Sequence, residues 1–352
     1  MDYFRGYKEF FSMKKRSLLV LAIVLANIVG GARGILAQTS STALTWTTVG
    51  DSAFGSSHIN GIAYGGERFV AVGADGKITY STNGASWTAV SNSAFGSSHI
   101  NGIAWGSGRF VAVGQSGKLA YSTDGASWTA VGDSAFGSSH IMGIAYGGGR
   151  FVAIGQNGKI AYSTDGASWT ALQSSPFGGS SIYGIAYGGS RFVAVGTQGK
   201  MAYSDDNGET WTAVSNSTFG TSYIGAIAYG NNRFVAVGGS GKMAYSDDNG
   251  VSWTAVSNST FGSATNGTSN INAIAYGIAD GASVGRFVAV GSSGKMATSS
   301  DGVTWTAVAD STIWEYTNSA GNPVTARINA IAYGKNRFVA VDSSGKMAYA
   351  DW

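Results

Sequence analysis

The sequence predicts an all-β fold, a seven-bladed β-propeller of four-stranded antiparallel blades, on three observations. The stretch GRFVAVGQSGKLAYSTDGASWTAV at residues 108–131 occurs, with small changes, in seven copies, the last one incomplete. The Arg-Phe pair of each copy returns after 41, 41, 41, 42, 53 and 51 residues, and a period of roughly 40–50 residues is typical of propellers and solenoids. Each copy also contains four short apolar segments without a helical period.

These four segments have the length and composition of β-strands. In the second copy they cover residues 100–106, 109–115, 118–123 and 127–131, separated by Gly-rich turns. They are rich in Val, Ile, Tyr, Phe and Trp, which favour strands. Their apolar residues fall on both faces, as in a small sheet packed between neighbouring sheets. Four strands in each of seven repeats therefore predict seven blades.

The seventh copy predicts how the ring closes. It ends at Trp352, before its fourth segment, whereas TSSTALTWTTVGDSAFGSSHI at residues 39–59 aligns with STNGASWTAVSNSAFGSSHI at residues 81–100. This alignment places Trp46 in register with the Trp of a fourth segment. We therefore expect an N-terminal strand to complete the last blade, which removes open sheet edges.

The first 37 residues have the order of a secretory signal peptide. Basic residues at 14–16 precede an apolar run at 18–29, and small residues follow. The run is short for a membrane span, with an uncleaved anchor as the alternative. We expect Met13 as the initiator and cleavage after Ala32 or Ala37. The expected location is secreted, periplasmic or at the cell surface.

Charge narrows the partners of the remaining domain, residues 38–352. Because residues 1–37 hold six Lys or Arg and two Asp or Glu, the domain keeps 16 basic and 17 acidic residues, a net charge of −1. This charge gives no electrostatic basis for binding nucleic acid or anionic membranes. Without Cys, disulfides and thiolate metal sites are excluded. We expect no cofactor, no membrane insertion after signal cleavage, and a monomer.

The turn after the third segment carries a recurrent motif. Residues 204–211, SDDNGETW, and 246–253, SDDNGVSW, follow the pattern Ser-x-Asp-x-Gly-x-x-Trp, and three copies are one residue shorter. Over residues 39–352 the motif resembles the Asp-box of BNR-repeat, sialidase-type propellers. An Asp in such a turn accepts backbone N–H bonds; a calcium site is the alternative. The resemblance places these turns at the blade periphery and implies a structural role for Asp124, Asp165, Asp206, Asp248 and Asp301.

The seven copies form an internal alignment that separates scaffold from variable positions. The Arg of Arg-Phe and the Lys of Gly-Lys recur in all seven and account for 14 of the 16 basic residues after position 37. We assign them to the scaffold, and only Arg327 and Lys335 lie outside this pattern. Strand order places the second-to-third turn and the inter-blade loop on one face, opposite the Asp turns. That face carries the variation.

Two variable positions flank the Ile that opens each first strand. Before it stand His58, His99, His140, Ser181, Tyr223, Asn270 and Arg327; after it stand Asn60, Asn101, Met142, Tyr183, Gly225, Asn272 and Asn329. A longer loop at 310–327 adds further polar and aromatic residues, which suit a binding surface above a rigid ring. We select as candidate ligand-binding residues His58, Asn60, Phe95, His99, Asn101, His140, Tyr183, Tyr223, Asn270, Trp314, Glu315, Tyr316 and Arg327.

The function expected is that of an exported, non-catalytic propeller that binds a glycan or a protein on this face. The first three blades share SAFGSSHI, so aromatic, amide and imidazole groups could form repeated sites that gain strength through multivalency. Recent duplication of the repeats explains the same similarity. A protein-assembly scaffold is a further alternative. Three His on adjacent blades suggest a metal, but equivalent positions on a ring need not converge, and we expect no metal site.

A sialidase-like glycoside hydrolase is the enzymatic alternative. Its best arrangement has Tyr316 as nucleophile and Asp310 as acid, with Glu315 and Arg327 beside them. The resemblance implies an arginine cluster and an Arg-Ile-Pro motif, but only Arg327 is available and the motif is absent. One long loop is a poor platform for preorganised catalysis. We therefore expect no catalytic residue.

Overall fold

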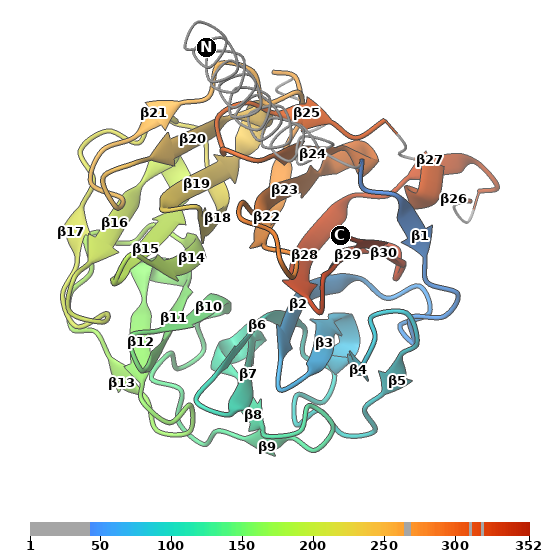
Figure 1. Cartoon of the computed structure of the whole chain (residues 1–352). Coiled ribbons are helices and arrows are strands. Elements are labelled where there is room, and N and C mark those ends of the chain that lie inside the picture. The colour runs from blue at the N-terminus through green and yellow to red at the C-terminus, as the bar shows by residue number, and fades with distance from the viewer. Residues whose placement is uncertain (1–42, 264–268, 310–311, 318–319) are drawn as a thin grey trace, which may run out of the picture. The chain divides into compact units, whose positions relative to one another are not determined.

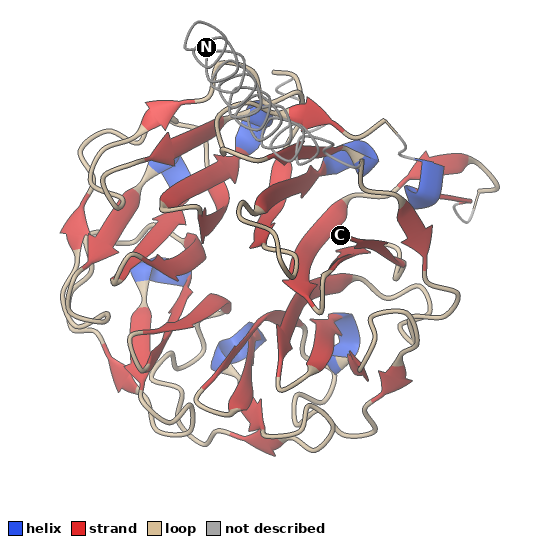
Figure 2. Cartoon of the chain, viewed as in Figure 1, coloured by secondary structure: helices blue, strands red, loops and turns tan. Residues whose placement is uncertain are grey.

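The computed structural model describes residues 43–263, 269–309, 312–317 and 320–352. Leu44–Trp352 forms one compact unit that contains seven four-stranded antiparallel sheets. The sheets stand in a ring, each with its first strand innermost (Figure 1). Helical structure in the described residues is limited to short 3₁₀ turns (Figure 2). The predicted seven-bladed propeller is confirmed. The predicted signal peptide at residues 1–37 lies outside the described residues.

The strands keep the same bounds from blade to blade. The innermost strands are β2 Ile59–Gly65, β6 Ile100–Gly106, β10 Ile141–Gly147, β14 Ile182–Gly188, β18 Ile224–Gly230, β22 Ile271–Gly277 and β28 Ile328–Gly334. The second strands are β3 Arg68–Gly73, β7 Arg109–Gly114, β11 Arg150–Gly155, β15 Arg191–Gly196, β19 Arg233–Gly238, β23 Arg286–Gly291 and β29 Arg337–Asp342. The third strands are β4 Ile78–Ser81, β8 Leu119–Ser122, β12 Ile160–Ser163, β16 Met201–Ser204, β20 Met243–Ser246, β24 Met296–Ser299 and β30 Met347–Asp351.

The fourth strands and the turns complete each blade. The fourth strands are β5 Thr88–Ala89, β9 Thr129–Ala130, β13 Thr170–Ala171, β17 Thr212–Ala213, β21 Thr254–Ala255 and β25 Thr306–Ala307, with β1 Trp46–Thr48 in the last blade. The 3₁₀ turns are η1 Ala74–Gly76, η2 Gln115–Gly117, η3 Gln156–Gly158, η4 Thr197–Gly199, η5 Gly239–Gly241, η6 Ser292–Gly294 and η7 Thr312–Trp314. A hairpin, β26 Glu315–Thr317 and β27 Pro323–Thr325, projects at the outer rim (Figure 1).

The ring closes as the sequence predicts. β1 pairs antiparallel with β30, with Trp46 opposite Ala350 and Thr48 opposite Ala348. The last sheet therefore combines one N-terminal strand with three C-terminal strands. Trp46 is buried and packs in the same cluster as Phe338, so the closure is made by side chains as well as by strand pairing.

The hydrophobic cores lie between neighbouring blades. The second strand of each blade is almost fully buried: Phe69, Val70, Ala71 and Val72 of β3 have no exposed surface. One cluster joins residues of the first blade to Val339 and others of the last. Fully burying one Val or Phe side chain contributes about 1.5–3 kcal/mol, so these strands hold the blades together.

A buried aromatic side chain from each inter-blade loop fills the space between two blades. In the loop before the last blade this residue is Trp314, and in the other six it is Phe. The carbonyl oxygen of each Phe accepts a hydrogen bond from the Lys of a Gly-Lys pair, as from Lys118 Nζ to Phe95 O at 2.9 Å. The selection of Phe95 and Trp314 as ligand contacts is contradicted, because both side chains belong to the core. The six Phe are Phe54, Phe95, Phe136, Phe177, Phe219 and Phe261.

In the first six blades, the turn after the third strand is held by its own polar side chain. Asp124 Oδ1 accepts hydrogen bonds from the N–H groups of Ala126 and Ser127, both at 2.8 Å. The bond from Ser127 is the largest cause that lowers the pKa of Asp124 to about 2. Equivalent backbone N–H bonds reach the other four Asp side chains of the motif, Asp165, Asp206, Asp248 and Asp301.

The Arg of each Arg-Phe pair is a scaffold residue, and five of these Arg side chains donate a hydrogen bond to the next blade. Arg68 Nη1 donates to the carbonyl oxygen of Asp124 in the next blade at 2.7 Å, and its guanidinium lies 5.1 Å from the centre of the Tyr80 ring. Arg191 repeats both contacts, to Asn249 O at 2.8 Å and over Tyr203. These residues are therefore committed to the face that carries the Asp turns.

Among the described residues, no helix is long and apolar enough to cross a lipid bilayer.

Candidate functional site

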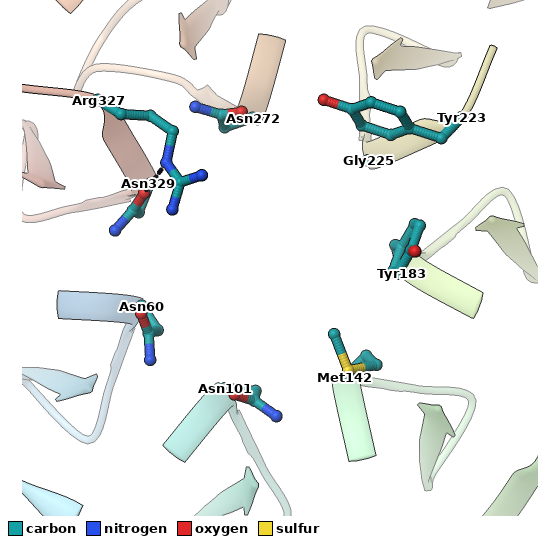
Figure 3. Close-up of a pocket in the computed structure, with 9 residues that line it drawn as sticks. All are labelled: Asn60, Asn101, Met142, Tyr183, Tyr223, Gly225, Asn272, Arg327 and Asn329. Atoms are coloured by element: carbon teal, nitrogen blue, oxygen red, sulfur yellow. Dashed lines mark hydrogen bonds between the residues drawn. The ribbon is translucent and has the colours of Figure 1, made fainter. Parts of the chain in front are cut away.

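A pocket of about 410 Å³ opens where the seven innermost strands begin (Figure 3). We call it the central pocket. Every blade contributes the residue that follows its opening Ile, and Tyr223 and Arg327 are added from the position before it. The pocket therefore lies on the face where sequence variation predicted a binding surface. Its lining is Asn60, Asn101, Met142, Tyr183, Tyr223, Gly225, Asn272, Arg327 and Asn329.

A break in strand pairing frees these residues from the sheet. In the first blade Ile59 pairs with Gly73 and Gly61 with Val72, so Asn60 has no partner on β3. The same register shift occurs at the equivalent residue of every blade. An extra residue of this kind is a β-bulge, which re-aims a side chain and is common next to functional sites.

Four of these residues are asparagines that each bond to the next blade. Asn60 Nδ2 donates to the carbonyl oxygen of Ile100 at 2.9 Å, and Asn101 Nδ2 donates to that of Ile141 at 2.8 Å. Asn272 and Asn329 repeat the bond to Ile328 and Ile59, at 2.9 and 2.8 Å. Because an amide has two N–H groups and an acceptor oxygen, each Asn keeps further bonding capacity. We call Asn272, Asn329, Asn60 and Asn101 the amide arc, which covers blades six, seven, one and two.

The other three blades place larger apolar surface on the pocket. Tyr183 and Tyr223 meet edge to face, with ring centres 6.2 Å apart and planes at 87°. Tyr223 lies against Gly239 of η5, where a Cβ atom would stand 2.9 Å from the Tyr223 ring. Burial raises the pKa of Tyr223, and the charge of Arg327 acts against this rise. We call Met142, Tyr183 and Tyr223 the aromatic arc, after its two Tyr rings.

Arg327 is the one charged residue among those that line the central pocket. Its Nε donates to Asn329 Oδ1 at 2.9 Å, and its carbonyl oxygen accepts from Ser343 N at 3.0 Å. Within the described part of the chain it makes no salt bridge. Its terminal nitrogens therefore have no carboxylate partner among the described residues.

A narrower cavity of about 190 Å³ shares Tyr183, Gly225 and Asn272 with the central pocket. It is lined by the small residues of the innermost strands and by one Ile from each of five blades. We call this cavity the throat. Its Ile and Ala side chains are apolar, and polar atoms, including those of Asn272, make up the rest of its surface. The Ile side chains and the amide arc therefore offer two kinds of surface to one ligand. The five Ile residues that line the throat are Ile62, Ile103, Ile144, Ile185 and Ile227.

The structure divides the sequence-selected candidates. Asn60, Asn101, Tyr183, Tyr223 and Arg327 line the pocket. Met142, Gly225, Asn272 and Asn329 also line it; they share the variable position after the opening Ile but were not selected. The sequence feature that could have identified them is their shared position after the opening Ile, because every blade contributes that residue to the pocket.

The selected His residues and Asn270 are not among the residues that line the pocket. His140 Nδ1 accepts from Ser116 N of the preceding blade at 2.9 Å, and Asn270 Oδ1 accepts from Ser240 N at 3.1 Å. These side chains hold neighbouring turns together. His58 is exposed and His99 is half-buried. No group of three or more His, Asp or Glu that could hold a metal ion is present in the residues described.

The hydrolase arrangement is not assembled at the pocket. Glu315 and Tyr316 belong to β26, at the outer rim of the ring (Figure 1), and neither lines the pocket. Lys346 Nζ donates to the carbonyl oxygen of Glu315, which ties the hairpin to the turn of the last blade. Asp310 lies outside the described residues. None of the residues that line the pocket is a carboxylic acid.

The sequence profile described as the DUF6242 beta propeller domain matches residues 40–177 and 143–350. The chain belongs to this family. The two overlapping matches agree with a repeating chain that aligns to the same profile in more than one register. The match establishes the propeller; membership of the BNR or Asp-box repeats stays a prediction. No curated protein matches the chain.

Solved structures show the same fold at low sequence identity. YCF48 bound to D1 peptide is 16% identical with a TM-score of 0.66, covering 89% of this chain and 96% of that one. Virginiamycin B lyase from Staphylococcus aureus is 13% identical with a TM-score of 0.65, covering 88% and 99%. The GH74 enzyme of Niastella koreensis is 20% identical with a TM-score of 0.61, covering 84% of this chain and 43% of that one. These similarities establish the architecture alone.

Proposed function

We propose that this protein is an exported, non-catalytic binding protein that takes a protein ligand at the central pocket. The observation that carries the proposal is the ring of bulge residues, one from each blade, which differ in chemistry on an otherwise repeated scaffold. A position that varies while its backbone geometry is constant is suited to recognition. A volume of about 410 Å³ is in the range of sites for small ligands or short segments.

The lining favours a peptide over a glycan. The aromatic arc and the Ile side chains of the throat offer apolar surface that an apolar side chain of a peptide can contact, whereas a sugar would place hydroxyl groups against it. The two Tyr rings already meet edge to face and are half-buried, so they form no open flat platform for a sugar ring. The amide arc supplies donors and acceptors that match a peptide backbone. YCF48, which shares the fold, has been solved with a D1 peptide, and this supports the same ligand class.

Matched peptide and glycan arrays test the proposal on the full chain. Gly225→Leu fills the pocket, because a Cβ atom at Gly225 meets its nearest neighbour at an ordinary 3.4 Å. Gly132→Leu is the control: it makes the same replacement in an exposed loop where no atom lies within 4 Å. We expect selective peptide binding that Gly225→Leu abolishes and Gly132→Leu retains.

Two outcomes would contradict this function. Selective glycan binding that Gly225→Leu abolishes would make the pocket a sugar site. Peptide binding that both variants retain equally would move the binding site away from the pocket. Circular dichroism and thermal unfolding of each variant would establish that the fold is intact in every comparison.

A further inference from the structure

We propose that the central pocket recognises the C-terminal end of a peptide whose last side chain is apolar. In this arrangement Arg327 binds the terminal carboxylate, and the aromatic arc and the throat take the side chain. The inference rests on the proposed function and adds the chemistry of the ligand to it.

The position of Arg327 suits a carboxylate. Because Nε is already bonded to Asn329 Oδ1, the side chain is oriented, and Nη1 and Nη2 remain as a fork. Such a fork binds a carboxylate through two parallel N–H···O bonds. No acidic residue lines the pocket to neutralise the guanidinium, so an anionic group of the ligand is the missing partner. The Asn side chains beside it can donate further N–H groups.

An apolar group of the ligand has its place across the pocket. Figure 3 shows Arg327 and Met142 on opposite sides, with Tyr183 and Tyr223 between them along the rim. The Ile side chains of the throat continue this apolar surface. A ligand that satisfies both sides must place a carboxylate at Arg327 and extend an apolar group past the Tyr rings toward Met142.

The C-terminal residue of a peptide meets this requirement, because its carboxylate and its side chain leave the same Cα atom. An internal Asp or Glu would instead require two chain segments to leave the pocket. A volume of about 410 Å³ is near the lower end of the usual range for ligand sites, which favours one chain end over a segment passing through.

Three libraries of N-terminally labelled pentapeptides test the inference by fluorescence polarisation with the full chain. The first ends in Leu or Phe with a free carboxylate. The second is identical but ends in a carboxamide. The third ends in the carboxamide and carries an internal Glu. We expect the first library to bind about tenfold to a hundredfold more tightly than the second, the range for a hydrogen bond to a charged group, and the third to bind like the second.

Two substitutions assign the effect to Arg327. Arg327→Gln removes the charge and should abolish the preference for the free carboxylate, and Arg327→Lys, which keeps the charge but not the fork, should retain part of it. Lys335→Gln is the control. It removes one positive charge from the turn between β28 and β29, where Lys335 contacts Thr82 O at 3.3 Å, and it should leave the preference unchanged. Unfolding temperatures measured in parallel establish that the variants are folded.

The outcomes separate this inference from the proposed function. Equal binding of the first two libraries, abolished by Gly225→Leu, would retain a peptide pocket but refute carboxylate recognition. Equal binding of the first and third libraries would make an acidic side chain the ligand and refute recognition of the terminus. If none of the libraries binds and the glycan array gives selective binding abolished by Gly225→Leu, the proposed function itself fails.

Discussion

The hydrogen bonds of the amide arc predict a pair of opposite effects on stability. Replacing Asn101 by Ala removes the bond from Nδ2 to Ile141 O and leaves that carbonyl oxygen without its side-chain donor. A bond of this kind contributes about 0.5–1.5 kcal/mol to the free energy of unfolding. For a large domain, a loss of about 1 kcal/mol lowers the unfolding temperature by about 2–4 °C.

The converse change should add the bond where a blade lacks it. Gly225 occupies the Asn position of the fifth blade, and its missing Cβ atom would lie 3.5 Å from the carbonyl oxygen of Ile271, the equivalent of Ile141. Gly225→Asn should therefore stabilise the protein. Part of that gain comes from restricting the unfolded chain, about 0.4–1 kcal/mol for Gly→Ala at a compatible position. Gly225→Ala measures this part, and we expect Gly225→Asn to exceed it by about 1 kcal/mol.

Urea unfolding followed by Trp fluorescence gives the free energies of unfolding of the unmodified protein and of the three variants under the same conditions. Equal slopes of the free energy against urea would show that the variants unfold from comparable native states. The reasoning is refuted if Asn101→Ala unfolds like the unmodified protein and Gly225→Asn is no more stable than Gly225→Ala. In that case the amides would make no net contribution to the contact between blades.

Three further predictions concern the scaffold. The pKa of Asp124 is lowered from 3.8 to about 2 in the folded protein, so its contribution to stability is present above about pH 4 and is lost as the pH falls through about 2. Asp124→Ala should therefore destabilise the protein less at pH 2 than at pH 7, and an equal loss at both pH values would contradict this. Deleting residues 39–49 should lower the unfolding temperature, and so should Trp46→Ala, which should reduce the free energy of unfolding by about 3–5 kcal/mol. An unchanged unfolding temperature would refute closure by β1. Phe95→Ala should reduce the free energy of unfolding by about 3–5 kcal/mol and leave the ligand selectivity of the folded protein unchanged. An altered array profile would indicate that Phe95 belongs to the binding surface.

Blade number, ring closure and the two faces could be predicted because each repeat reports on the same local environment. Seven copies of Arg-Phe identify a buried strand more firmly than one copy could. The same alignment argued against Phe95 as a ligand contact, because Phe occupies the equivalent position in six loops. Trp314 was harder to recognise, because a longer loop and a change from Phe to Trp conceal the same packing role. Its burial depends on β1 and β29, which are distant in the sequence.

The pocket could be predicted only in part, because its geometry depends on the bulge. Positions 58 and 60 have the same parity along a strand, so alternation places both toward one side. In the structure the second position of every blade reaches the pocket, whereas the first does so only through Tyr223 and Arg327. The shorter His140 instead accepts a bond from a neighbouring turn. Which of the residues before the opening Ile reaches the pocket depends on its side-chain length and on contacts with the next blade. The pattern of a single repeat does not show these contacts.

The order of the pocket residues around the ring argues for recognition over a trace of duplication. The first three blades share SAFGSSHI, yet the residue after the opening Ile is Asn in two of them and Met142 in the third. This position therefore changed while its surroundings stayed the same. The change is also ordered: Asn occurs in blades six, seven, one and two, which are contiguous only because the ring is closed. The bond from Asn329 to Ile59 O joins the last blade to the first, so the polar side of the pocket spans the junction at which the ring closes.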